Sequence, residues 1–150
     1  MSRDKILIGL TVILLIILGV VFWYDRNSAV LERTLPYQLT DDMKIVEMNK
    51  HGSLFARSSY EVKIRISHED PESVMDMISE AYDFGGGFIG PEEYADFSNG
   101  LFDGFRIRPN PEPNTFIWVM SAKDEGYHEV THIICSESAT DAYLYIYYNR

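Results

Sequence analysis

Residues 128–132 carry the most specific chemical pattern in the chain, with histidines at positions 128 and 132 and a glutamate at position 129. On a helix, His128 and His132 would stand one turn apart on the same face, where their ring nitrogens could bind one metal ion. On a strand, about 13 Å would separate the two residues, too far to share an ion. Their neighbours favour a strand, because four of them are β-branched: Val130, Thr131, Ile133 and Ile134.

The string His128-Glu129-Val130-Thr131-His132 resembles the HExxH motif of zinc-dependent peptidases, and the resemblance covers these five residues only. It implies zinc held by His128 and His132, with water activated by Glu129. The third ligand of the longer motif is missing, since Cys135 and Ser138 stand where that motif has glycine and histidine. We therefore interpret 128–132 as an ordinary strand without metal or cofactor. A membrane-anchored zinc peptidase is the alternative.

A glycine-rich string, residues 85–90, formally matches the dinucleotide-binding pattern GxGxxG. That pattern binds phosphate only between a strand and a helix, whereas here it follows an expected helix. Glu92 and Glu93 would also repel a phosphate. We interpret the string as a flexible turn.

The segment 83–115 combines aromatic side chains, acidic side chains and glycines, a composition that suits a recognition loop. The alternative is that the rings complete the core beneath the loop. The residues predicted to bind a partner are Phe88, Glu92, Glu93, Tyr94, Asp96, Phe97, Phe102 and Asp103.

The single cysteine, Cys135, excludes an intramolecular disulfide. It lies in an apolar run, residues 132–135, which favours a small buried side chain over a nucleophile. The fold must therefore rest on its hydrophobic core.

Residues 6–24 form an uncharged apolar run whose helix would be roughly 28 Å long, close to the thickness of a bilayer core. The run is longer than the apolar region of a secretory signal and ends in bulky Phe22, Trp23 and Tyr24, without small residues for cleavage. We predict a retained single-pass anchor. The short N-terminal flank, with Arg3 and Lys5, should stay in the cytoplasm, so that the following domain is extracytoplasmic.

Charge separates the anchor region from the rest of the chain. Residues 27–150 hold 10 Lys and Arg against 21 Asp and Glu, a net charge of −11. Such a surface repels nucleic acid and anionic lipid headgroups, and any partner selected by charge would be basic.

After the anchor, the hydrophobic pattern predicts an α+β fold, a two-layer sandwich of mostly antiparallel strands with one main helix. Residues 25–40 read as a tether, with Leu35 extended because proline follows it. In 54–67, apolar Tyr60, Val62, Ile64 and Ile66 alternate with charged residues, which predicts one face on a core and one in water. Asp70 and Pro71 fit a helix N-terminus, and a change of parity after Ile45 predicts a β-bulge.

Further expectations concern the connecting segments and the end of the chain. They are a strand over 41–50, turns over 49–52, 123–126 and 136–141, a short helix over 91–97, a strand over 101–108, a stiff linker over 109–113, and strands over 116–120, 127–135 and 142–148. The tyrosines of the last strand are expected to keep wet hydroxyls. The predicted domains are a flank 1–5, an anchor 6–24, a tether 25–40 and a globular domain 41–150.

These features predict a non-enzymatic, membrane-anchored protein whose acidic domain binds another protein. An inhibitor-like or immunity-like role against a basic partner suits the size, charge and tether, by analogy at the level of architecture, and a subunit of an envelope complex is the other role considered.

Overall fold

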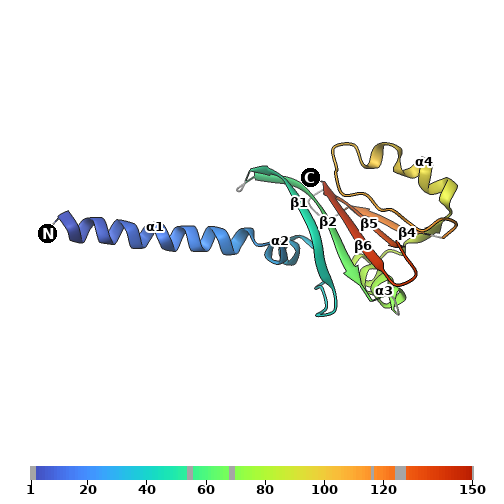
Figure 1. The fold of residues 1–150 in the computed structure, drawn as a ribbon, viewed down its shortest axis with the longest axis horizontal. Helices are drawn as coiled ribbons and strands as arrows, with labels where there is room; N and C mark the ends of the chain where they lie inside the picture. The colour runs from blue at the N-terminus through green and yellow to red at the C-terminus, as the bar shows by residue number, and fades with distance from the viewer. Residues whose placement is uncertain (1–2, 54–55, 68–69, 116, 124–127, 150) are drawn as a thin grey trace. The chain divides into compact units, whose positions relative to one another are not determined.

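A computed structural model describes residues 3–53, 56–67, 70–115, 117–123 and 128–149. The chain forms two units, Met1–Gln38 and Leu39–Arg150. Its helices and strands, in chain order, are α1 (Arg3–Asp25), α2 (Asn27–Thr34), β1 (Lys44–Ser53), β2 (Ala56–Ile66), α3 (Pro71–Tyr82), β3 (Gly87–Ile89), α4 (Pro91–Leu101), β4 (Ile117–Lys123), β5 (Glu129–Ser136) and β6 (Ala142–Asn149). This is an α+β fold with an apolar N-terminal helix, as the sequence predicts (Figure 1).

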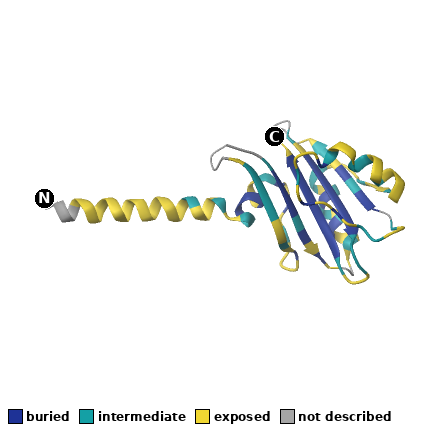
Figure 2. Ribbon diagram, turned by 45° about the horizontal axis from the view of Figure 1, so that its top comes forward, coloured by how far each residue is buried: buried dark blue, intermediate teal, exposed yellow. Residues whose placement is uncertain are grey.

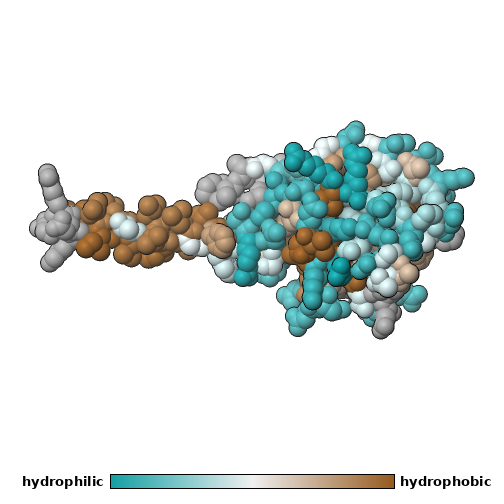
Figure 3. Space-filling model, in the orientation of Figure 1, coloured by the Kyte–Doolittle hydropathy of each residue, from teal (hydrophilic) through white to brown (hydrophobic). Residues whose placement is uncertain are grey.

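The first unit is dominated by α1, whose apolar side chains are exposed all around the helix (Figure 3). Residues Ile6–Asp25 are long and apolar enough to cross a membrane. The segment expected to be a tether contains the eight-residue helix α2. Leu35, which precedes Pro36, then has the extended backbone that proline demands.

The second unit is built on one open sheet of six antiparallel strands in the order β1-β2-β6-β5-β4-β3. Strands β1 and β2 form a hairpin, and β4, β5 and β6 form the predicted meander. The two groups join through β2 and β6, where Val62 pairs with Ile146 and Ile64 with Leu144. The central strands carry the most deeply buried side chains (Figure 2).

Helix α3 begins where the sequence predicts it. The Asp70 carboxylate accepts a hydrogen bond from the Ser73 N–H at 3.1 Å, and Pro71 occupies the first turn. The helix buries Val74 and Ile78 and ends at Asp83, whose backbone is left-handed. Tyr82 packs its ring edge-on against His132 of β5, with 5.3 Å between ring centroids. Helix α3 therefore covers the sheet face that His132 shares with Ile64, Leu144 and Ile146.

The face of β2 that carries Glu61, Lys63 and Arg65 was expected to meet water, which is correct for Arg65 but wrong for the buried Glu61. Helix α4 and the coil after it cover this face, where Phe102 and Ile107 pack with Ile133, Tyr145 and Tyr147 in one buried cluster. Tyr145 and Tyr147 therefore do not keep wet hydroxyls. Apolar–charged alternation in β2 does not reveal this layer, because Glu61 is charged and yet fully buried beneath it.

Three local features of the strands compare directly with the sequence. The predicted bulge is confirmed, because the β1–β2 pairing shifts register between Ile45 and Glu47. The turn predicted over 49–52 is wrong, since β1 continues to Ser53, with an irregularity at Gly52, whose φ is 94°. The turn over 123–126 and the start of the strand at Leu54 fall mostly outside the described residues.

The irregular region differs in two places from its expectations. Residues Gly87–Ile89 of the glycine string form the edge strand β3 on β4, so this string is not simply a turn. Residues 102–108 form no strand, although one was expected over 101–108. The predicted short helix over 91–97 is confirmed and extends to Leu101, with a kink at Asn99 and Gly100.

Gly86 is required by close packing against Trp118. A Cβ at position 86 would lie 2.2 Å from the Trp118 indole, which is buried on β4. We predict that Gly86→Ala lowers the free energy of unfolding by about 1–3 kcal/mol, because the buried indole must shift. Urea unfolding of the full chain in detergent micelles, followed by circular dichroism, measures this loss.

Gly87→Ala is the matched control, because a Cβ at position 87 has no atom within 4 Å. An equal loss in both variants would contradict the packing argument.

Candidate functional site

The HExxH string lies at the start of β5, not on a helix. Glu129 is exposed, His128 is half-buried and His132 is fully buried. His128 Nδ1 shares a 2.5 Å hydrogen bond with the Tyr148 hydroxyl. The arrangement on which zinc peptidases depend, two histidines on one helical face beside a glutamate, is not formed by these residues.

Burial gives His132 a structural role. It lowers the pKa of His132 to about 3, so the imidazole is neutral at physiological pH. Within the described ranges, no three side chains of His, Cys, Asp or Glu cluster so that they could hold a metal ion.

Cys135 is buried on β5, which confirms its interpretation as a small core side chain. Burial raises the pKa of its thiol to about 12, and the nearby Glu137 carboxylate adds to this effect. The thiol is therefore protonated at neutral pH and is a poor nucleophile.

The predicted partner-binding residues divide into two groups. Three of the aromatics support the core, because Phe102 is buried against Tyr147 while Tyr94 and Phe97 pack against the same cluster. The other five are exposed: Phe88, Glu92, Glu93, Asp96 and Asp103.

Three of the exposed residues, Glu92, Glu93 and Asp96, lie on α4. Glu92 and Asp96 lie four residues apart on the helix and therefore share one face. Glu93 has a separate task at the helix N-terminus, where its carboxylate accepts the Gly90 N–H at 3.0 Å. Phe88 is 63% exposed on the edge strand β3, where it shares the sheet face of Trp118 and Ile134, opposite the face that α4 covers. The surface formed by Glu92 and Asp96 is called the α4 surface below.

A buried carboxylate that the sequence did not single out fixes the coil after α4. Glu61 on β2 has 0% exposure. Its oxygens accept the N–H groups of Arg106 at 2.9 and 2.7 Å and of Ile107 at 2.7 Å. The Asn49 amide donates to Glu61 at 3.1 Å, and His51 Nε2 lies 3.4 Å from the same oxygen.

A neighbouring contact strengthens this attachment. The Tyr147 hydroxyl donates to the Ile107 carbonyl at 2.8 Å. Burial raises the pKa of Tyr147, so the hydroxyl stays protonated and can donate. Glu61 and Tyr147 together bind both the N–H and the C=O of Ile107.

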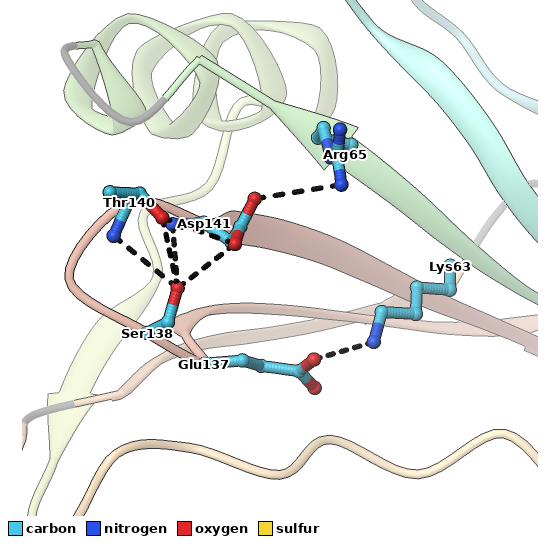
Figure 4. A network of polar contacts seen from close by, with 6 residues as sticks. All are labelled: Lys63, Arg65, Glu137, Ser138, Thr140 and Asp141. Atoms are coloured by element: carbon cyan, nitrogen blue, oxygen red, sulfur yellow. Dashed lines mark hydrogen bonds and ion pairs between the residues drawn. The ribbon is translucent and has the colours of Figure 1, made fainter.

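A second carboxylate, Glu137, attaches the coil further along. It accepts hydrogen bonds from Lys63 Nζ at 2.5 Å, from the Asn110 N–H at 3.0 Å and from the Tyr145 hydroxyl. Burial raises the pKa of Glu137, but these hydrogen bonds outweigh it and the pKa is lowered below its usual value. Figure 4 shows the Lys63–Glu137 pair beside the β5–β6 turn.

The turn itself is a closed hydrogen-bond network (Figure 4). The Ser138 hydroxyl donates to Asp141 at 3.0 Å and accepts the N–H groups of Thr140 and Asp141 at 3.3 and 3.1 Å. Asp141 also lies 3.5 Å from Arg65, a solvent-exposed pair that adds little stability. These contacts shape the predicted turn and engage the Ser138 hydroxyl within it.

Comparisons of the chain with protein-family models, with curated proteins and with solved structures found no match.

The role of Glu61 can be tested by removing its charge. We predict that Glu61→Gln lowers the free energy of unfolding by about 1.5–3 kcal/mol, because charge-assisted hydrogen bonds in a buried site are lost. Hydrogen exchange at the Arg106 and Ile107 amides should accelerate at least roughly tenfold, since about 1.4 kcal/mol corresponds to that factor.

Glu47→Gln on β1 is the matched control, because Glu47 is exposed. Unchanged exchange at Arg106 and Ile107 in Glu61→Gln would show that the coil is held by other contacts.

The buried His132 makes stability depend on pH. Its pKa is lowered in the folded chain, so the unfolded chain binds the proton first as the pH falls below about 6.5. We predict that stability declines between pH 6.5 and 4, with a contribution from His132 of up to about 1.4 kcal/mol per pH unit. His132→Leu should reduce this slope in urea unfolding measured across that range.

Thr131→Val serves as the control, because it changes a buried neutral side chain on the same strand. Parallel pH profiles for wild type and His132→Leu would mean that His132 is not the titrating group.

Proposed function

We propose that this protein is a single-pass membrane protein whose acidic globular domain binds another protein and catalyses no reaction. The observation that carries the proposal is α1, a helix of bilayer length whose apolar side chains are exposed on every side. Lipid is the environment that removes such a surface from water. The basic N-terminal flank favours a cytoplasmic N-terminus, with the domain in the periplasm or outside the cell.

The α4 surface supports binding of a basic protein. Glu92 and Asp96 are exposed on one helical face of α4. A net charge of −11 over residues 27–150 would steer a basic partner and disfavour nucleic acid. Inhibitor-like and immunity-like roles and a role as envelope-complex subunit all fit this surface.

A non-enzymatic role is supported by how the reactive side chains are used. His132 is neutral and buried, the Cys135 thiol is protonated, and Glu61 is saturated by backbone donors. The zinc-peptidase alternative gains no support, because its three residues lie on or beside a strand.

The α4 surface gives the sharpest test. The photoreactive amino acid p-benzoylphenylalanine is placed at the exposed Ala95, which lies beside Asp96 on α4. Tyr94 is not used, because its ring packs against the core cluster. The full chain is expressed in its native host cells and irradiated. We predict that the probe at position 95 forms a covalent crosslink to one specific protein. Combining the probe with Glu92→Gln and Asp96→Asn should reduce its yield about tenfold, because two charge contacts are lost.

The matched control neutralises Asp76 and Glu80, which are exposed and have the same four-residue spacing on α3. Glu93 is left intact because it caps α4. Equal yields in both double variants would refute the α4 surface. The orientation is tested with a reporter that is active only in the cytoplasm, fused after Arg150. Activity of this reporter would refute the proposed orientation.

A further inference from the structure

Strand β3 forms one outer edge of the sheet, and among the described strands it pairs with β4 alone. The other side of its backbone therefore has no strand beside it in the described part of the chain. Gly85 and Gly87 are exposed, and a Cβ built at either position would have no atom within 4 Å. A strand from another molecule can thus approach this edge closely.

The pairing with β4 holds the edge in one conformation. Phe88 pairs with Trp118, and the backbone at Gly86 lies directly against the Trp118 indole. On the other face of the sheet, Ile89 packs against the core cluster beneath α4. An incoming strand therefore meets an extended backbone that is already ordered, which lowers the entropy cost of pairing.

Exposed aromatic rings flank the glycines of this edge. Outside α1, the large apolar side chains that the structure describes as exposed are Val46, Phe84 and Phe88. Phe84 is 59% exposed just before the glycines, and Phe88 is 63% exposed just after them. An added strand would place every second side chain on the sheet face of Phe88, where an apolar residue would cover its ring.

The charge around this edge is of one sign. Residues 67–105, which include α3, β3 and α4, contain ten Asp and Glu and no Lys or Arg. The acids nearest to β3 in the chain, Asp83 before it and Glu92 after it, are both exposed. A second copy that presented the same edge would bring like charges together, whereas a strand that carries Lys or Arg is attracted.

The other outer strand, β1, has features that oppose strand addition. Its pairing with β2 is interrupted by a bulge between Ile45 and Glu47 and by an irregularity at Gly52. It also carries the exposed Lys44. Bulges and lysines protect sheet edges from pairing, so β1 is not the edge that a partner strand would extend.

We propose that the β3 edge binds an extended basic segment of the partner protein by strand addition. The segment pairs its backbone with β3, places an apolar side chain beside Phe88 and carries Lys or Arg among the surrounding acids. Because β3 has only three residues, few backbone hydrogen bonds form, and the ring contact and the charges supply the rest of the affinity. This inference rests on the proposed function in one respect, that the partner is a basic protein.

The test is a titration of the ¹⁵N-labelled full chain in non-ionic detergent micelles, followed by NMR. The probe is a short capped peptide that alternates lysine and valine. One control alternates glutamate and valine, and a second is the probe with every backbone nitrogen methylated, which keeps its charges and removes its N–H donors. We expect saturable shifts at the amides of Gly87, Phe88 and Ile89 with the probe, and roughly tenfold weaker binding of both controls.

Variants of the chain then assign the site. Phe88→Ser should weaken binding of the probe about fivefold, because the apolar cross-strand contact is lost. Val46→Ser is the matched control, because it removes an exposed apolar side chain from the opposite edge strand and should bind the probe as wild type does. An unchanged amide spectrum away from the substituted strand verifies the fold of each variant.

Three results would overturn the proposal: no saturable shift at β3, equal binding of either control peptide, or equal weakening by Val46→Ser and Phe88→Ser. Shifts at β3 that grow with protein concentration in the absence of peptide would assign the edge to a second copy and overturn it as well. A protein crosslinked from position 95 without peptide binding at β3 would refute this edge and not the proposed function. Peptide binding at β3 without any protein crosslinked from position 95 would support the edge and refute the α4 surface.

Discussion

The second unit depends on a buried carboxylate that holds irregular backbone on a sheet. Glu61 lies in a central position of β2, where it accepts the N–H groups of Arg106 and Ile107. A buried charge carries a large desolvation penalty, which only several well-directed hydrogen bonds offset. Because those bonds come from backbone groups, they fix the path of a coil that has no helix or strand pairing of its own.

This attachment determines how the sheet is covered. Without it, Phe102 and Ile107 would not be held over Tyr145 and Tyr147, and the face of the sheet opposite α3 would be open to water. Glu137, directly after β5, acts in the same way. Its carboxylate accepts the Asn110 N–H of the same coil, while Lys63 balances its charge. Both carboxylates therefore fix the coil that follows α4 against the sheet.

The parts that follow from local patterns were predictable from the sequence. Asp70 and Pro71 mark the start of α3, the parity change after Ile45 marks the bulge, and the apolar runs mark the meander. The covering layer was not predictable in this way. The alternation around Glu61 and Lys63 reads the same whether that face meets water or a coil more than forty residues away in sequence. Nor does a tyrosine such as Tyr145 reveal whether its hydroxyl will find water or Glu137.

The same long-range contacts explain why only part of the predicted partner-binding set is exposed in the structure. Aromatic residues in a glycine-rich loop suggested one recognition surface, but Tyr94, Phe97 and Phe102 were needed to fill the space above the sheet. What remains exposed of the predicted residues is chiefly acidic. On β5, burial keeps His132 neutral and the Cys135 thiol protonated, so these two side chains contribute to packing and not to reactivity.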